Sequence, residues 1–205
     1  MARPNPADAG RNAGYRCRWM TGGKMSHYES SQENRKMKWV DRVFDSNVPI
    51  NLYPELIERL RGTPARIEEL TESLPEKLLV QREGDKWSIQ EHVGHLIDVE
   101  ALFLGRLDDY EAGKPTLRPA EISGRKTYEA NYNDGDIASI LIRFRRVRGE
   151  YVHRLEGWDA TVFGRTALHP RLNRQMVVTD MLHFQAEHDD HHLARVTELI
   201  RSFRN

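Results

Sequence analysis

Three histidines near the end of the chain have the types and spacing most suited to chemistry. His188, His191 and His192 lie within a long uninterrupted helical pattern. A helix turns once every 3.6 residues, so His188 and His192 lie one above the other on the same face, with His191 beside them. Two imidazoles at i and i+4 can bind one transition metal through nitrogens at about 2.0–2.1 Å. Because two ligands from one helix do not make a tight site, we expect a third from elsewhere.

The third ligand is predicted from an earlier helical stretch that contains His92 and His95. Three residues along a helix leave these two side chains about 60° apart, so only one is expected to point straight at the centre of a bundle. His95 is in line with the apolar residues Val99 and Leu102, which favours His95 over His92. Three neutral nitrogen ligands with an open position are typical of a catalytic metal site rather than a structural one.

Other interpretations of these residues stay open. A histidine pair on one helix, taken alone, is more often a solvated surface feature than a pair of ligands. His191 either replaces His192 as the second metal ligand, at i+3 from His188, or donates a hydrogen bond that orients a ligand. Carboxylates can also orient imidazoles in this way; the candidates are Asp98, Glu187 and Asp189. A zincin protease motif is not matched, because Asp189 rather than glutamate follows His188. The isolated histidines are interpreted as surface or core residues: His27, His153, His169 and His183.

Four helices are predicted to position these side chains. Apolar residues recur with a helical period over residues 53–74, 88–113, 136–157 and 176–203. The second stretch begins with a capping box, in which Ser88 caps the helix and Glu91 follows three residues later. Gly62 and Pro64 predict a break in the first stretch. Long connections over 114–135 and 157–175 join the last three helices.

The fold class predicted from this pattern is all-α, a four-helix bundle with long inter-helix connections. Strand signals are limited to the apolar triplets 78–80 and 161–163, which do not support a sheet core. A single bundle would place the site between facing helices. Residues 1–36 are rich in Gly, Pro, Asn, Ser and Arg without an apolar period, and predict a loose, flexible N-terminal extension. Residues 37–205 are then the bundle domain.

The charge balance excludes some classes of partner. Lys+Arg and Asp+Glu both number 31, so the formal net charge is zero. This argues against a nucleic-acid-binding protein or a polybasic membrane protein. The sequence has no apolar run near the ~20 residues that cross a bilayer. The single cysteine, Cys17, cannot form an internal disulfide, so we expect a cytoplasmic, reducing setting. The basic run 143–148 is interpreted as a solvated face with Phe144 and Val147 turned inward, or as a surface for an anionic partner.

Two segments resemble the DinB/YfiT-like superfamily. Residues 87–98, WSIQEHVGHLID, are similar to the start of that family's second helix, and residues 186–196, AEHDDHHLARV, are similar to its last helix. The resemblance spans roughly residues 52–203, with both motifs in the family's order. It implies a four-helix bundle that holds a divalent metal through three histidines. Position by position, these are His95, His188 and His192, the same three that helix geometry selects.

The resemblance implies less about the reaction than about the fold. Relatives include S-transferases that use thiols such as bacillithiol or mycothiol, and a maleylpyruvate isomerase. It implies a divalent transition metal (zinc, nickel, iron or manganese) that acidifies a thiol or water. The leading hypothesis is transfer of a low-molecular-weight thiol to an electrophilic small molecule. The alternatives are a hydrolase that uses metal-bound water, with Asp98, Glu187 or Asp189 as base, and a non-catalytic metal-binding bundle. Homodimers are common among the relatives, so a homodimer is also expected.

Overall fold

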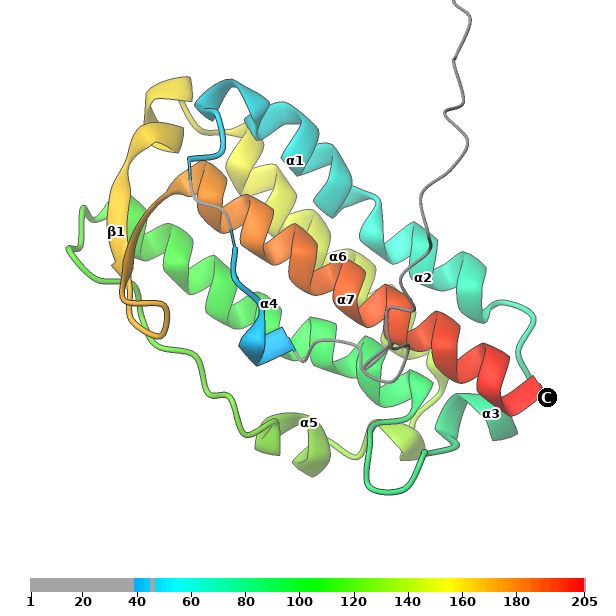
Figure 1. Cartoon of the computed structure of the whole chain (residues 1–205). Coiled ribbons are helices and arrows are strands. Elements are labelled where there is room, and N and C mark those ends of the chain that lie inside the picture. The colour runs from blue at the N-terminus through cyan, green and yellow to red at the C-terminus, as the bar shows by residue number, and fades with distance from the viewer. Residues whose placement is uncertain (1–38, 45–46, 205) are drawn as a thin grey trace, which may run out of the picture. The chain divides into compact units, whose positions relative to one another are not determined.

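The structure, a computed structural model, describes residues 39–44 and 47–204 (Figure 1). The predicted extension over residues 1–36, with Cys17 and His27, lies outside these residues, and its boundary with the bundle stays a prediction. The helices are α1 (Tyr53–Arg61), α2 (Thr63–Thr71), α3 (Glu76–Val80), α4 (Ile89–Glu111), α5 (Arg125–Glu129), α6 (Ile137–Glu156) and α7 (Val178–Arg204). Short 3-10 helices are η1 (Trp39–Asp41), η2 (Ile50–Leu52), η3 (Tyr132–Asp134) and η4 (Ala160–Gly164), and the two strands are β1 (Thr166–His169) and β2 (Arg174–Val177).

The bundle is formed by α1 with α2, and by α4, α6 and α7. The α1–α2 pair packs against α6 and α7, and α4 packs against the same two helices. Figure 1 shows α1 and α2 along one side of α7 and α4 along the other. The predicted all-α four-helix bundle is therefore confirmed. Among the described residues, no helix combines the length and the apolar character needed to cross a membrane.

Local sequence signals set the ends of these helices. Gly62 separates α1 from α2, and Pro64 occupies the first turn of α2, so the predicted break is present. At the start of α4, Glu91 N donates to Ser88 Oγ at 3.1 Å and Ser88 N donates to the Glu91 carboxylate at 2.8 Å. This capping box fixes the point at which α4 begins, and with it the rotation of every side chain on that helix.

The connection between α6 and α7 contains a hairpin that the sequence pattern did not predict. Strands β1 and β2 are antiparallel and pair Ala167 with Met176 and His169 with Arg174. Leu117 N donates to the carbonyl of Leu168 at 3.0 Å, which joins the chain after α4 to this hairpin. The apolar triplets 78–80 and 161–163 instead lie in the helical turns α3 and η4. The hairpin closes one end of the bundle beside the start of α7.

The basic run 143–148 is only partly solvated. Arg143, Arg145 and Arg146 are exposed and Phe144 is buried, as the prediction requires. Arg148, however, has 1% of its surface exposed, so its interpretation as part of a solvated face is wrong. Two buried carboxylates pair with its guanidinium, and this pairing allows an arginine to lie in the core.

Gly94 on α4 lets the ring of Tyr132 come close to the helix backbone. A Cβ on Gly94 would lie 2.2–2.4 Å from three carbons of that ring, so the ring would have to move. We expect Gly94→Ala to lower the free energy of unfolding by about 1–3 kcal/mol, the usual effect of overpacking, measured by urea denaturation.

Gly149→Ala is the matched control for this prediction. Gly149 is exposed within α6, and nothing lies within 4 Å of a Cβ built there. Alanine is favoured over glycine inside a helix, so this variant should be unchanged or more stable by up to about 1 kcal/mol. Equal stability of both variants would contradict the packing argument for Gly94.

Candidate metal centre

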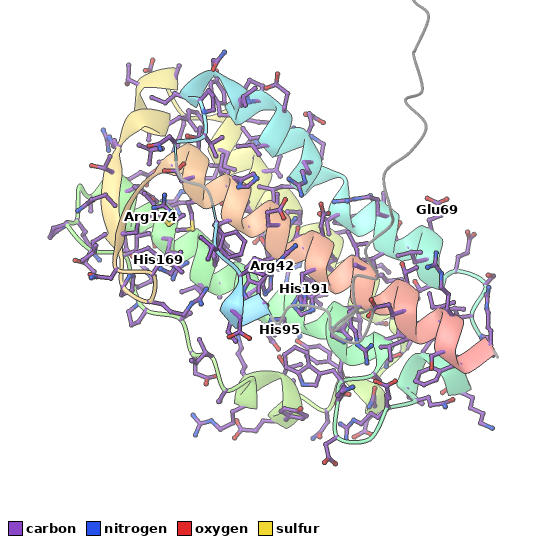
Figure 2. The ribbon with its side chains drawn as sticks, in the orientation of Figure 1. Arg42, Glu69, His95, His169, Arg174 and His191 are labelled. Carbon is purple, nitrogen blue, oxygen red and sulfur yellow. The ribbon has the colours of Figure 1, made fainter. Side chains whose placement is uncertain are left out.

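The structure brings together the three histidines selected from the sequence. His188 and His192 lie one turn apart on α7, and their Nε2 atoms are 3.2 Å apart. His95 on α4 faces them, with ring centroids 5.3 Å from His188 and 4.8 Å from His192. One nitrogen from each ring can be chosen so that all three lie within 4.8 Å of one another. Figure 2 labels His95 on α4 and His191, the neighbour of His192 in the chain, on α7.

His95 is oriented by a hydrogen-bonded chain that ends at a buried carboxylate. Its Nδ1 lies 3.1 Å from Thr127 Oγ1, which donates to Asp98 at 3.0 Å. Since the threonine proton goes to Asp98, the hydroxyl oxygen accepts the Nδ1 proton of His95. The lone pair of His95 is therefore on Nε2. The hydroxyl of Tyr132 also donates to Asp98, at 2.9 Å, and holds that carboxylate in place. Asp98 thus helps to orient the His95 ring through the hydroxyl of Thr127.

His192 is oriented by His92. The Nδ1 atoms of His92 and His192 are 2.9 Å apart, so one of these rings donates to the other. A proton on Nδ1 of His192 leaves its Nε2 lone pair facing His188. His191 packs with its ring against Trp39 and His192. The sequence presented His92 only as the rival of His95, but both residues contribute, His95 to the cluster and His92 to its support.

The two carboxylates of α7 that were expected to orient imidazoles have arginine partners instead. Asp189 accepts hydrogen bonds from Arg148 and from Thr63. Glu187 is paired with Arg59 at 2.7 Å. Of the three predicted carboxylates, Asp98 is the one with a hydrogen-bonded route to the cluster. Thr127, which provides that route, lies in the long connection after α4 and carries no local sequence signal.

Burial keeps the clustered imidazoles neutral. It lowers the pKa of His95 to about 4 and, with the charge of His95 as a second cause, lowers the pKa of His92 to about 3. The pKa values of His188 and His192 are held well below the ordinary value, first by burial and then by neighbouring histidines. Neutral imidazoles carry the free lone pairs that a metal needs.

The donor set fits a divalent transition metal. Two nitrogens bound at about 2.0–2.1 Å with a tetrahedral angle are about 3.3 Å apart, close to the 3.2 Å between Nε2 of His188 and Nε2 of His192. Three imidazoles without a thiolate or a carboxylate suit zinc, nickel, iron or copper rather than magnesium or calcium. Trp87 covers His95, with ring centroids 4.5 Å apart, and Trp39 covers His188 at 5.1 Å.

A cavity of about 140 Å³ adjoins the cluster, and His95 and His188 are part of its wall. Most of the wall is apolar and aromatic, contributed by Trp39, Trp87, Val99, Leu102, Phe103 and Phe184. Its polar residues away from the cluster are Arg106, Glu121, His169 and Arg171. A small molecule in this cavity would be in contact with the histidine cluster and shielded from water on most sides.

Removal of the hydrogen bond that orients His95 should weaken metal binding without removing a ligand. We expect Thr127→Val, which keeps the shape but loses the hydroxyl, to lower metal affinity about 10–100-fold, as is typical for partners of metal-ligating histidines. Thr127→Ser keeps the hydroxyl and is the matched control. The measurement is competition with a chromogenic chelator at constant pH, and equal affinities of the valine and serine variants would contradict this role.

Fold and site together define a class of protein, a four-helix bundle in which two facing helices bring three histidines together around one point. The family follows from the sequence. The profile of the DinB superfamily matches residues 59–196, and the chain belongs to this superfamily. The matched range includes His95, His188 and His192. A search of the curated proteins finds no match.

Two solved structures show the same fold. One is YfiT from Bacillus subtilis, described as a probable metal-dependent hydrolase with an unusual four-helix bundle topology. The two sequences are 20% identical, and the superposition covers 79% of this chain and 93% of the YfiT chain with a TM-score of 0.68. The other is a mycothiol-dependent maleylpyruvate isomerase, 10% identical, with 72% of this chain and 60% of that chain covered and a TM-score of 0.56. At these identities the likeness establishes the fold alone.

Proposed function

We propose that this chain is a metal-dependent enzyme that transfers a low-molecular-weight thiol to an electrophilic small molecule. The observation that carries the proposal is the cluster of three neutral histidines, two buried and one half-buried, that opens on a largely apolar cavity. His95, His188 and His192 would hold a divalent transition metal. Such a metal lowers the pKa of a thiol that binds to it, so that the thiol becomes a nucleophile near neutral pH.

The residues around the cluster supply position and shielding. Thr127 with Asp98 and His92 fix the rings of two ligands, so the lone pairs point at one place before any ion arrives. The aromatic wall of the cavity limits the access of water, which otherwise competes with a thiol for the electrophile. In the reaction the sulfur forms a bond to the electrophilic carbon, the leaving group departs with its electron pair, and the thiol proton passes to solvent.

The surroundings of the cluster favour thiol transfer over hydrolysis. Hydrolysis in such sites is assisted by a carboxylate that takes a proton from water. Of the described residues in the cavity wall, Glu121 alone is acidic, and it is exposed, with its pKa lowered by hydrogen bonds from Ser123. Of the three bases suggested by the sequence, Asp189 and Glu187 are paired with arginines, and Asp98 accepts hydrogen bonds from Thr127 and Tyr132. A thiol acidified by the metal needs no such base.

The relatives support both candidate reactions. A mycothiol-dependent isomerase has the same fold, which favours a small thiol as co-substrate. The Bacillus subtilis protein is described as a probable metal-dependent hydrolase, which keeps hydrolysis as the second candidate. Pairing of two chains stays a prediction for either function.

An activity screen on the full-length, metal-loaded protein separates these functions. One panel combines small thiols with chloroaromatic and epoxide electrophiles, and a second contains esters and amides. Thiol transfer that disappears in His188→Ala, beside an inactive second panel, is the expected result. Metal-dependent hydrolysis of the second panel with no thiol transfer would assign the alternative function. Metal binding without turnover in either panel would argue for a non-catalytic bundle.

A further inference from the structure

At the hairpin end of the cavity, two buried N–H groups have no acceptor among the described residues. The first is on His169, in β1, where Leu172 N donates to Nδ1 at 3.2 Å. Because Nδ1 accepts this hydrogen bond, the neutral ring carries its proton on Nε2. That Nε2 atom is buried and has no partner in the described part of the chain. A buried donor without an acceptor is costly, and proteins seldom leave one unless something else binds to it.

The second group belongs to Arg106 on α4, which has 1% of its surface exposed. Its Nε donates to the carbonyl of Arg118 at 3.3 Å and its Nη1 points at the sulfur of Met181 at 3.6 Å. Its Nη2 is buried and has no partner among the described residues. Arg106 therefore differs from Arg148, the other fully buried arginine of the described chain, whose guanidinium is paired with two carboxylates.

The guanidinium of Arg106 is nevertheless charged. Burial lowers its pKa to about 10, which leaves it protonated at neutral pH. The nearby carboxylate of Asp109 is already bound by Lys114 and Arg118. A buried cation without a counter-ion is strongly disfavoured, and a bound anion would compensate it.

The positive charge is concentrated at one end of the cavity. Arg106, His169 and Arg171 all line the wall, and the pKa of His169 is lowered first by burial and then by the charges of the two arginines. Glu121, the acidic residue of the wall, acts instead on His95 at the opposite side. Figure 2 shows His169 toward the hairpin end of the bundle and His95 further along α4. The cavity thus connects a cationic end with the histidine cluster.

We propose that Arg106 and His169 form a subsite for the carboxylate group of the small molecule that occupies this cavity, with its reactive atom at the histidine cluster. A carboxylate offers two acceptor oxygens, one for Nη2 of Arg106 and one for Nε2 of His169, and its charge compensates the guanidinium. Arg171, half-buried at the same end, adds attraction for an anion. The subsite rests on the proposed function only in treating the cavity as the substrate site, since the two donors need no metal to bind an anion.

The test uses the full-length protein freed of metal with 1,10-phenanthroline and dialysed, so that a metal cannot bind the probe. Butyrate and the neutral, nearly isosteric butyramide are titrated separately and followed by NMR chemical shifts. We expect butyrate to bind saturably and butyramide to bind at least about tenfold more weakly, because a charge-assisted hydrogen bond is lost. Equal binding of the two probes, or binding of inorganic phosphate with none of butyrate, would overturn the proposal.

Variants then locate the binding site. Arg106→Met should weaken butyrate binding at least about tenfold, and thermal melting shows whether the variant is folded. His169→Leu removes the other donor and provides the same test if Arg106→Met does not fold. Arg143→Gln removes an exposed arginine of α6 and should leave butyrate binding unchanged. Butyrate binding that survives both cavity substitutions would contradict the subsite.

Metal-loaded protein identifies which reactant carries the carboxylate. Tighter binding of 3-mercaptopropionate than of butyrate places the carboxylate on the thiol, and equal binding places it on the electrophile; either result is compatible with the subsite. If the purified protein proves unable to bind a metal, the proposed function fails, whereas butyrate binding to the metal-free protein still decides on the subsite.

Discussion

His95→Ala, His188→Ala and His192→Ala should each abolish stoichiometric metal binding. Each substitution removes one of three nitrogens that can surround a single point. Substitution of a residue that only orients a ligand typically lowers metal affinity about 10–100-fold. Loss of a ligand itself should therefore lower metal affinity at least about 100-fold. The measurement is elemental analysis of protein purified without chelators, combined with affinity measured by chelator competition.

His92→Ala is the informative comparison for this prediction. His92 is buried, on the same helix as His95, and 2.9 Å from the Nδ1 atom of His192. If it only orients His192, its loss should weaken binding about 10–100-fold and leave the protein able to fill with metal at saturating concentration. His153→Ala, on an exposed position of α6, should change nothing. Metal loss in His92→Ala with metal retained in His95→Ala would exchange the roles of these two residues.

Stability provides an independent measure of the same site. A metal that binds the folded chain but not the unfolded one stabilises it by RT ln(1 + [L]/Kd), which is about 2.7 kcal/mol at 100 times Kd. The melting temperature of the wild type should therefore rise with added metal, while those of His188→Ala and His192→Ala should not. A rise that is equal in all three proteins would point to binding elsewhere.

The parts of the site that could be predicted from sequence are those that depend on one helix at a time. The i, i+4 spacing of His188 and His192 places both rings on one face of α7, whatever surrounds them. The alignment of His95 with Val99 and Leu102 similarly selected the ring that reaches the cluster. The capping box at Ser88 fixed where α4 begins. The bundle itself followed from four apolar periods, because each helix needs a partner for its apolar face.

The remaining features depend on contacts between distant parts of the chain. Thr127 reaches His95 across 32 residues, from a connection whose path no local pattern sets. The hairpin β1–β2 joins two four-residue strands, too short and too polar to show an alternating pattern. His169 looked isolated for the same reason, since its significance comes from a cavity formed by α4, the hairpin and α7. Arg148 was misread because its partners are 41 and 48 residues away.

Arg148 is also the centre of the described core's main buried charge network. Its guanidinium donates to Glu100 at 2.6 Å and to Asp189 at 2.6 Å, and to the carbonyl of Leu60 at 2.8 Å. Thr63 donates to the same Asp189 at 2.8 Å. The network therefore connects α1, α2, α4, α6 and α7 through hydrogen bonds that require one relative position of these helices. Since Asp189 is adjacent to His188 on α7, the network also fixes the helix that presents two of the clustered histidines.

Arg148→Met should be the most destabilising of the substitutions considered, lowering the free energy of unfolding by about 3–5 kcal/mol. The methionine fills most of the space, but two carboxylates remain buried without their cation, and burial already raises the pKa of Glu100. The measurement is urea denaturation at pH 7. Arg146→Met, on an exposed position of the same helix, should stay within about 0.5 kcal/mol of the wild type.

Replacing Arg148 together with Glu100 and Asp189 tests why Arg148→Met is unstable. The cause is either the loss of the ion pairs or the burial of two carboxylates without a cation. If the unpaired buried carboxylates cause the instability, adding Glu100→Met and Asp189→Leu to Arg148→Met should restore most of the lost free energy of unfolding. The reason is that an apolar replacement of a whole buried network is often neutral. The restored protein should nevertheless bind metal less well than the wild type, since the hydrogen bonds that set the position of α7 are gone. Full recovery of both stability and metal affinity would show that packing alone positions His188 and His192. The Arg148 network would then have no role in placing these histidines.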